Sequence, residues 1–266
     1  SAGTDGSLMN KHAFAVVFAP LLALLVIYPL VALVLHLDWD GVSRTLVDPF
    51  FWDAVKNTIL AALAAAALGV LMAIGFGFCH LFLKESWLYK VANLVNDLPS
   101  ALPHTVAGLA LLLAFGRQSF GFVGPTGLAF TLTAVVLAMF FVSYPLAARA
   151  IAAGVDQMDH DTIAVARTLG DSPSRAYLRI VIPHLNEALL SGFLIAFARS
   201  LGEFAAVIIF SGNVPGSTQV LASYVFTKVE EGELSMAVSA SAFCLLLSFC
   251  LVMVLRATRR GHASNR

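Results

Sequence analysis

The chain has 266 residues and no net charge, with 16 Lys and Arg against 16 Asp and Glu. Hydrophobic residues make up 59% of it and charged residues only 12%. A soluble domain of this length could not bury so much apolar surface, which excludes a soluble globular protein and indicates a chain solvated by a lipid bilayer. The neutral balance gives no indication of nucleic-acid binding. Three cysteines lie in apolar runs without metal-ligand spacing, so we expect them to be small buried apolar residues rather than disulfides or metal ligands.

The first eight residues, SAGTDGSL, precede Met9 and are interpreted as an expression remnant, which leaves a single membrane domain over 9–266. An apolar run over 13–35 follows, long enough to cross a hydrocarbon core of about 30 Å. No small-residue cleavage site follows this run. We therefore expect a retained membrane helix rather than a signal peptide.

Five more apolar spans give an all-α membrane protein with about six transmembrane helices. They cover roughly 58–83, 98–115, 128–148, 188–210 and 236–255. The third span contains Pro99, Pro103 and Gly108. Irregular backbone at membrane depth is tolerated only where protein or a water-filled cavity satisfies it. The third span is therefore either a helix that lines a transport pathway or a kinked packing helix.

The Lys and Arg residues between the spans predict the orientation, since they gather on the cytoplasmic side. If 149–187 and both termini are cytoplasmic, the inside set is Lys11, Lys84, Lys90, Arg149, Arg167, Arg175, Arg179, Arg256, Arg259, Arg260 and Arg266. The outside set is Arg44, Lys56, Arg117 and Lys228, while Arg199 lies within a span. This imbalance predicts a multi-pass protein with both termini in the cytoplasm.

The 155–185 segment is the longest polar interval between two apolar spans. Asp159 and Asp161 provide helix-start signals, and good helix formers then continue to Gly170. Gly170 to Pro173 form a turn cluster, after which a second amphipathic helix is expected. The segment is thus a predicted helix–turn–helix with a mixed apolar and basic surface. It would either lie on the membrane surface near lipid phosphates or bind a cytoplasmic partner.

This segment resembles the EAA loop of ABC-importer permeases. The pattern of that loop is Glu-Ala-Ala, three residues, Gly, nine residues, Ile, one residue and Leu-Pro. Gly170, Ile180 and Pro183 stand at the matching positions. Ala-Val-Ala at 164–166, however, replaces Glu-Ala-Ala. The charge contact with an ATPase that the family's glutamate would make is therefore not expected here. The resemblance implies a type I ABC importer permease fold with a coupling helix that seats in a groove of an ATPase. The residues it assigns to coupling are Ala164, Ala166, Arg167, Gly170, Asp171, Ser172, Arg175, Ile180 and Pro183.

Three further stretches, 97–116, 141–151 and 197–221, are similar to the sulfate and molybdate branch of these permeases. This similarity implies a tetrahedral oxyanion as cargo: sulfate, thiosulfate, molybdate or tungstate. It also implies two copies of an ATPase that hold ATP and Mg, an external substrate-binding protein, and a second permease, identical or related, in a bacterial inner membrane. The chain itself has no Walker-type loop. We therefore expect no enzymatic activity, cofactor or metal in this chain.

Two groups of polar residues are candidates for the pathway or its gate, together with Pro103. Arg199 and Glu203 are four residues apart in the fifth span and so share one helix face. They would either form an ion pair that fixes helix packing, or Arg199 would attract a passing anion. Ser211, Gly212 and Asn213 open a loop that is expected to be part of an outer gate or a binding-protein contact. His80 and His104, near span ends, are expected to be packing residues.

Other functions remain open at this point. A related permease could carry another cargo, such as phosphonate or iron. An ATP-independent carrier or channel would require more ionisable groups in its spans than Arg199 and Glu203. A scaffolding subunit would leave the broken third span without a purpose.

Overall fold

The computed structural model describes residues 3–117 and 127–263, and within these ranges it contains helices and no strand. The helices are α1 (Gly3–Leu35), α2 (Trp39–Val47), α3 (Pro49–Phe82), α4 (Trp87–Ala101), α5 (His104–Phe115), α6 (Leu132–Asp156), α7 (His160–Thr168), α8 (Pro173–Ala176), the π-helical turn η1 (Tyr177–Val181), α9 (Ile182–His184), α10 (Asn186–Leu201), α11 (Ala205–Ser211), α12 (Leu221–Glu230) and α13 (Leu234–Ala263).

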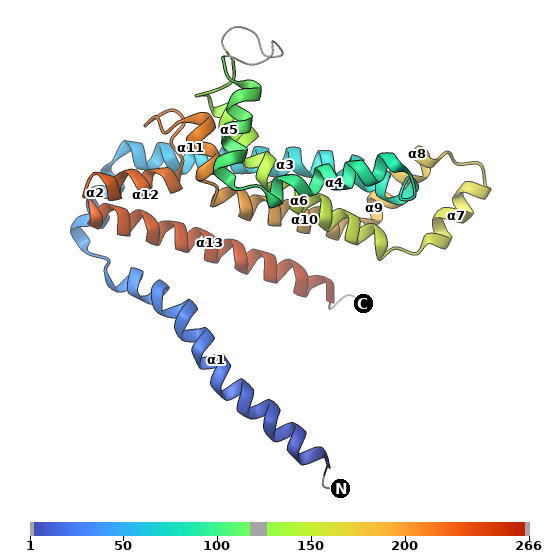
Figure 1. Cartoon of the computed structure of the whole chain (residues 1–266), viewed down its shortest axis with the longest axis horizontal. Coiled ribbons are helices and arrows are strands. Elements are labelled where there is room, and N and C mark those ends of the chain that lie inside the picture. The colour runs from blue at the N-terminus through green and yellow to red at the C-terminus, as the bar shows by residue number, and fades with distance from the viewer. Residues whose placement is uncertain (1–2, 118–126, 264–266) are drawn as a thin grey trace.

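The long helices α3, α6, α10 and α13 run side by side along the longest axis of the molecule (Figure 1). Small residues line the contact between α3 and α6, where Ala65 and Ala138 are fully buried. Gly154 of α6 lies so close to α10 that a Cβ there would stand 2.5 Å from Ala188 Cβ. Close backbone approach through small residues is how membrane helices pack, because burial of apolar surface gives them little drive to associate.

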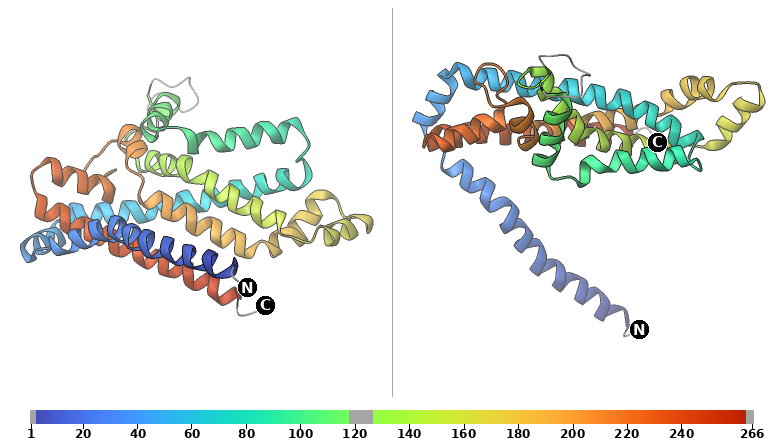
Figure 2. Two further views of the ribbon diagram at one scale, coloured as in Figure 1. Left: turned by 60° about the horizontal axis from the view of Figure 1, so that its bottom comes forward. Right: turned by 45° about the horizontal axis from the view of Figure 1, so that its top comes forward.

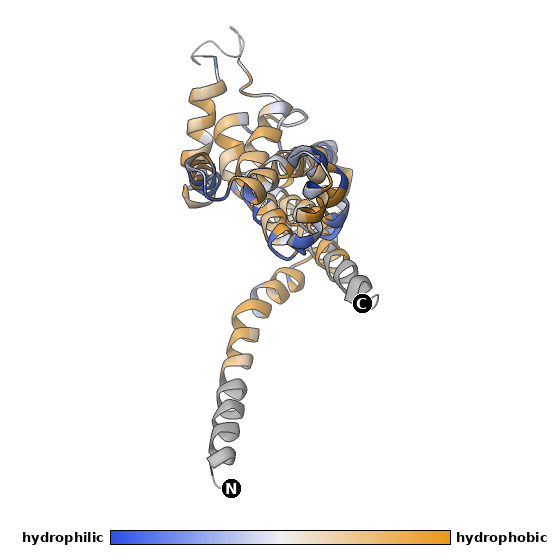
Figure 3. Cartoon of the chain, turned by 90° about the vertical axis from the view of Figure 1, so that its right-hand side faces the viewer, coloured by the Kyte–Doolittle hydropathy of each residue, from blue (hydrophilic) through white to orange (hydrophobic). Residues whose placement is uncertain are grey.

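The candidate membrane spans agree with the expected number of about six. In the described part of the chain, four helices are long and apolar enough to cross a bilayer, and two bent helix pairs raise the number to six. The bent pairs are Trp87–Ala101 with His104–Phe115, at 116°, and Pro173–His184 with Asn186–Leu201, at 72°. Figure 3 shows apolar residues along the part of α1 nearest the bundle and over the bundle, as helices in contact with lipid require.

The third predicted span is broken at Pro103, as its prolines suggested. Pro103 has no N–H to donate and disfavours helical backbone in Leu102, so α4 ends at Ala101 and α5 starts at His104. After the bend, α5 stands across the direction of the bundle (Figure 1). It packs on α11 through Gly108, where a Cβ would lie 2.8 Å from the carbonyl oxygen of Ala206.

The fifth predicted span is not one continuous helix, which corrects the expectation for 188–210. Helix α10 ends at Leu201 and α11 begins at Ala205. Glu203 lies in the break, and its Oε1 accepts the N–H of Ala206 at 3.0 Å. Arg199 and Glu203 therefore meet across a helix end rather than along one helical face.

The fourth span is also longer than predicted. Helix α6 continues through the alanine-rich stretch to Asp156, so Arg149 lies inside a helix and not in a loop. Its charge is accommodated there because Arg149 Nη2 donates to Asp97 Oδ2 of α4. Arg149 is for this reason a weak contributor to the orientation count.

Candidate functional sites

The 155–185 segment is the predicted helix–turn–helix. Helix α7 begins at the N-cap Asp159 and ends in two hydrogen bonds, from Gly170 N–H to the Arg167 carbonyl and from Asp171 N–H to the Ala166 carbonyl, both at 3.1 Å. This pair of bonds is a Schellman motif, whose penultimate residue adopts left-handed backbone. Gly170 has φ +98° and meets that requirement without a Cβ penalty.

The second helix of the segment begins at Ser172, whose Oγ accepts the Arg175 N–H, and Pro173 occupies its first turn. It continues through the π-helical turn η1 into α9, which contains Pro183 and ends at His184. The second amphipathic helix expected after the turn is therefore present and ends one residue after Pro183. Single π-helical turns are rare in proteins, and many of those that occur lie at functional positions.

Tyr177 attaches this second helix to the membrane bundle. The side chain is buried, and its hydroxyl donates to the Ile74 carbonyl of α3 at 2.6 Å. Its ring meets the Phe78 ring edge-on at 5.3 Å. Gly77 makes room for this contact, since a Cβ there would lie 2.7 Å from the tyrosine oxygen. Tyr177 is thus an aromatic anchor of the segment on α3, beside Ala176 and Val181, which are buried in the same core cluster.

The opposite side of the segment is open. Val165, Leu169 and Leu178 are 57%, 83% and 63% exposed, an unusual exposure for aliphatic side chains. Most of the residues assigned to coupling are exposed: Ala164, Arg167, Gly170, Ser172, Arg175 and Pro183. The other three, Ala166, Asp171 and Ile180, are half-buried. The segment thus presents apolar side chains interleaved with arginines, as the sequence predicted.

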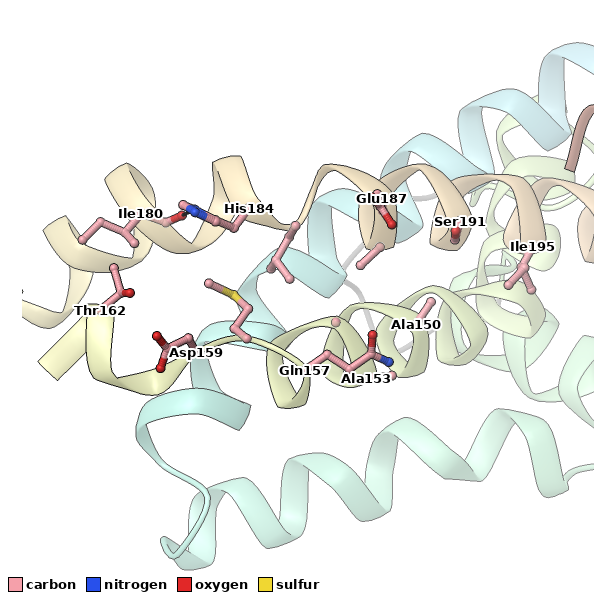
Figure 4. A pocket seen from close by; sticks show the side chains of 14 residues that line it. Ala150, Ala153, Gln157, Asp159, Thr162, Ile180, His184, Glu187, Ser191 and Ile195 are labelled. Atoms are coloured by element: carbon pink, nitrogen blue, oxygen red, sulfur yellow. Dashed lines mark hydrogen bonds between the residues drawn. The ribbon is translucent and has the colours of Figure 1, made fainter. Parts of the chain in front are cut away.

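A polar groove of about 580 Å³ lies between the α6–α7 stretch on one side and the η1–α9–α10 stretch on the other (Figure 4). Gln157, Asp159 and Thr162 line one side, and His184 and Ser191 line the other. The groove lies at the bend between α9 and α10. Leu185 at this bend is itself buried, so the groove opens beside a packed joint.

The second candidate site lies where the two broken helices meet. Arg199 Nη2 is 2.8 Å from Glu203 Oε2, 2.8 Å from His104 Nε2 and 3.0 Å from His104 Nδ1. His104 Nδ1 is in turn 3.3 Å from Glu203 Oε2. The predicted ion pair is present, and His104 joins it from the start of α5. The sequence reading missed this contact. His80, expected to be a packing residue near a span end, is buried and also hydrogen-bonded to Tyr89 and Asp156.

The loop after α11 packs on α3 at the end of the bundle that carries α2 and α12 (Figure 2). Asn57 Nδ2 donates to the carbonyls of Ser217 and Gln219 at 2.9 and 3.1 Å. Asn213 Nδ2 donates to Thr227 Oγ1 at 2.7 Å. Gly212 has φ +73°, and Ser211 is fully buried. The structure thus brings this loop to the far end of the molecule from the 155–185 segment.

Curated relatives match nearly the whole chain. "Probable transport system permease protein NifC" of Clostridium pasteurianum is 30% identical over 89% of this chain and 84% of its own length. "Probable sulfate transport system permease protein cysT" of Prototheca wickerhamii is 30% identical over 97% of this chain and 100% of its own length. The corresponding protein of Salmonella typhimurium, "Sulfate transport system permease protein CysT", is 30% identical over 86% of this chain and 85% of its own length.

Solved structures of ABC importers share the fold. One chain of a bacterial ABC transporter that imports the acidic polysaccharide alginate superposes with a TM-score of 0.77 at 14% identity, covering 96% of this chain and 97% of that one. An amino acid ABC transporter gives a TM-score of 0.60 at 21% identity over 84% and 99%. The fold is thus that of ABC importer permeases.

Residues 65–260 match the family model described as "Binding-protein-dependent transport system inner membrane component". The match includes the helix–turn–helix of 155–185, the joint of the broken helices and the loop after α11. This chain belongs to the family of binding-protein-dependent transport system inner membrane components.

Proposed function

We propose that this chain is the permease subunit of an ATP-driven, binding-protein-dependent importer for a tetrahedral oxyanion of the sulfate and molybdate type. Family membership and the names of the CysT relatives support the transport reaction and the cargo class. The observation that carries the coupling to ATP is the exposed apolar and basic surface of the 155–185 segment on its Tyr177 anchor.

Two copies of an ATPase, each with its own ATP and Mg, bind this surface in the proposed complex. Leu169 and Leu178 would enter an apolar groove of the ATPase, and the exposed arginines would pair with its acidic side chains. When the ATPases close, the segment moves with them. The motion passes to α3 through Tyr177 and to α10 through the chain itself, because the second helix of the segment leads directly into α10.

The opposite end of the molecule receives the cargo. The 155–185 segment and both termini would lie in the cytoplasm of a bacterial cell, with the loop at 211–219 and helices α2 and α12 outside. An external binding protein would release its anion at that outer end. A solved relative, the alginate transporter, binds such a periplasmic protein loaded with its own ligand.

A second permease, identical or related, completes the pathway in this proposal. Residues Phe18–Leu35 of α1 have a mean hydropathy of 2.6, yet none of this window is buried within the chain. Helix α1 also diverges from the bundle (Figure 2). A helix in that position contacts the other permease and the surrounding lipid rather than its own core.

Uptake into proteoliposomes tests this function. The chain would be reconstituted with a cognate ATPase and binding protein, and labelled sulfate, molybdate and phosphonate would be supplied outside. The proposal expects sulfate or molybdate to accumulate only with ATP, Mg and the binding protein. Uptake without ATP would identify a carrier or channel, and uptake of phosphonate alone would identify another cargo.

A further inference from the structure

His80 is a buried side chain that joins its own helix to two others. It lies in the last turn of α3 and is 7% exposed. Its Nε2 is 2.9 Å from Asp156 Oδ1 of α6, and its Nδ1 is 2.6 Å from the Tyr89 hydroxyl of α4. Because a carboxylate only accepts, Nε2 donates to Asp156, and Nδ1 of the neutral ring then accepts the Tyr89 O–H. Both ring nitrogens are therefore used, one for each neighbouring helix.

Asp156 marks the point where the 155–185 segment leaves the bundle. It is the last residue of α6, and Val155 before it is buried. The half-exposed carboxylate of Asp156 also accepts from Lys84 Nζ at 3.3 Å. Lys84 is itself exposed, and ion pairs of this kind contribute little. The contact that orients Asp156 is therefore the one with the buried ring of His80.

The same stretch of α3 also receives the second helix of the segment. The Tyr177 hydroxyl donates to the carbonyl of Ile74, and His80 lies less than two turns further along the helix. Both ends of the 155–185 segment are thus attached to one short part of α3, the first through Asp156 and the second through Tyr177. A movement of the segment reaches α3 at this place.

Tyr89 extends this connection to α4. Its bond to His80 holds the first turn of α4 against α3, and the contact of Asp97 with Arg149 holds α4 against α6 further along. Helix α4 leads to the break before α5, and α5 packs on α11. A displacement of Asp156 is therefore passed through His80 to α4, and from there to the joint of the broken helices.

We propose that His80 is a positioning residue for the coupling of ATP to transport. Its two hydrogen bonds make the start of the 155–185 segment, α3 and α4 move as one body when the ATPases close. This inference rests on the proposed function and names the residue that passes the movement of the segment to the broken helices. A purely structural role would differ, since it would lower stability and leave coupling unchanged.

Substitutions of His80 and Asp156 separate these two roles. His80→Phe keeps a buried ring and removes both hydrogen bonds, whereas His80→Gln keeps a donor that can reach Asp156. Asp156→Ala and its combination with His80→Phe complete a double-mutant cycle. The matched control is His36→Phe, because His36 is exposed and its ring contacts only the Ala32 carbonyl of the preceding turn among the described residues.

The reconstituted complex with ATPase and binding protein is assayed in three ways: ATP hydrolysis stimulated by loaded binding protein, sulfate and molybdate imported per ATP hydrolysed, and thermal unfolding. The proposal expects His80→Phe to assemble and to hydrolyse ATP, while anion imported per ATP falls about fivefold or more, as for the loss of one hydrogen bond of ordinary strength. His80→Gln should keep most of the coupling, and the control should import like wild type. The double variant should fall no further than the single variants, because all three break the same connection.

Wild-type import per ATP in His80→Phe, whatever its unfolding temperature, would overturn the proposal. Losses that multiply in the double variant would overturn it too, because His80 and Asp156 would then act separately. If His80→Phe does not assemble, Asp156→Ala provides the test, since it alters a half-exposed side chain, and wild-type coupling there would overturn the proposal. Failure of the proposed function is distinct, since wild type itself would then show no ATP-dependent uptake.

Discussion

Tyr177 offers a test of how the 155–185 segment is attached to the bundle. Tyr177→Phe removes one hydrogen bond to the Ile74 carbonyl, which is worth about 0.5–1.5 kcal/mol. Tyr177→Ala also removes a buried ring that packs against Phe78, and such truncations cost about 3–5 kcal/mol. We therefore expect a graded loss of attachment, with the Phe variant close to wild type and the Ala variant clearly destabilised but still held by Ala176 and Val181, which are buried in the same cluster.

Two measurements in one reconstituted complex follow this loss. Thermal unfolding can be monitored with a thiol-reactive dye, because Cys79 and Cys244 are half-buried in the folded chain. Anion imported per ATP hydrolysed reports coupling. The matched control is Leu178→Ala: Leu178 is the next residue but 63% exposed, so its loss should change the free energy of unfolding by less than about 0.5 kcal/mol and weaken ATPase binding instead. Unchanged unfolding and unchanged coupling in Tyr177→Ala would refute the anchor.

Three further predictions concern other parts of the chain. Gly108→Val should destabilise the α5–α11 contact by about 1–3 kcal/mol in thermal unfolding, whereas Gly75→Val, with no atom within 4 Å of the new Cβ, should not. Asn57→Leu should release the loop at 212–220, seen as faster amide exchange there, because two loop carbonyls lose their donor. The pKa of Asp38 lies below its ordinary value because the backbone N–H of Gly41 and then the Ser235 hydroxyl donate to it. Its stabilisation of the start of α2 is thus present above the ordinary pKa of 3.8 and lost as the pH falls through the lower folded value, and Asp38→Asn should abolish this pH dependence of amide exchange in α2. An equally strong pH dependence in Asp38→Asn would contradict this assignment.

The membrane helices could be predicted because hydropathy is a local property of the sequence. The turn at Gly170 was equally predictable, since a Schellman motif requires a residue that tolerates positive φ, and the sequence has glycine there. Pro103 marked the break between α4 and α5 for a similar reason: proline limits its own backbone and that of the preceding residue.

The joint of the broken helices could not be predicted in the same way. The apolar run over 188–210 contains no proline; α10 ends at the C-cap Gly202, and Glu203 accepts the N–H of Ala206 in the first turn of α11. The contact between His104 and Arg199 joins residues 95 positions apart. A single sequence contains no signal for such a pairing. The functional roles of Arg199, of the outer loop and of the residues assigned to ATPase coupling remain predictions.

The measurement that decides whether this chain couples ATP to transport compares wild type with Gly170→Arg in proteoliposomes containing the ATPase and binding protein. The new side chain has open space around it, so the variant acts through the strained backbone at φ +98° and a bulky cation on the surface proposed to bind the ATPase. Uptake and ATP hydrolysis are recorded together. We predict ATP-dependent import of sulfate or molybdate in wild type and its loss in the variant. Import that needs no ATP, or that persists unchanged in Gly170→Arg, would contradict the coupling role of the 155–185 segment.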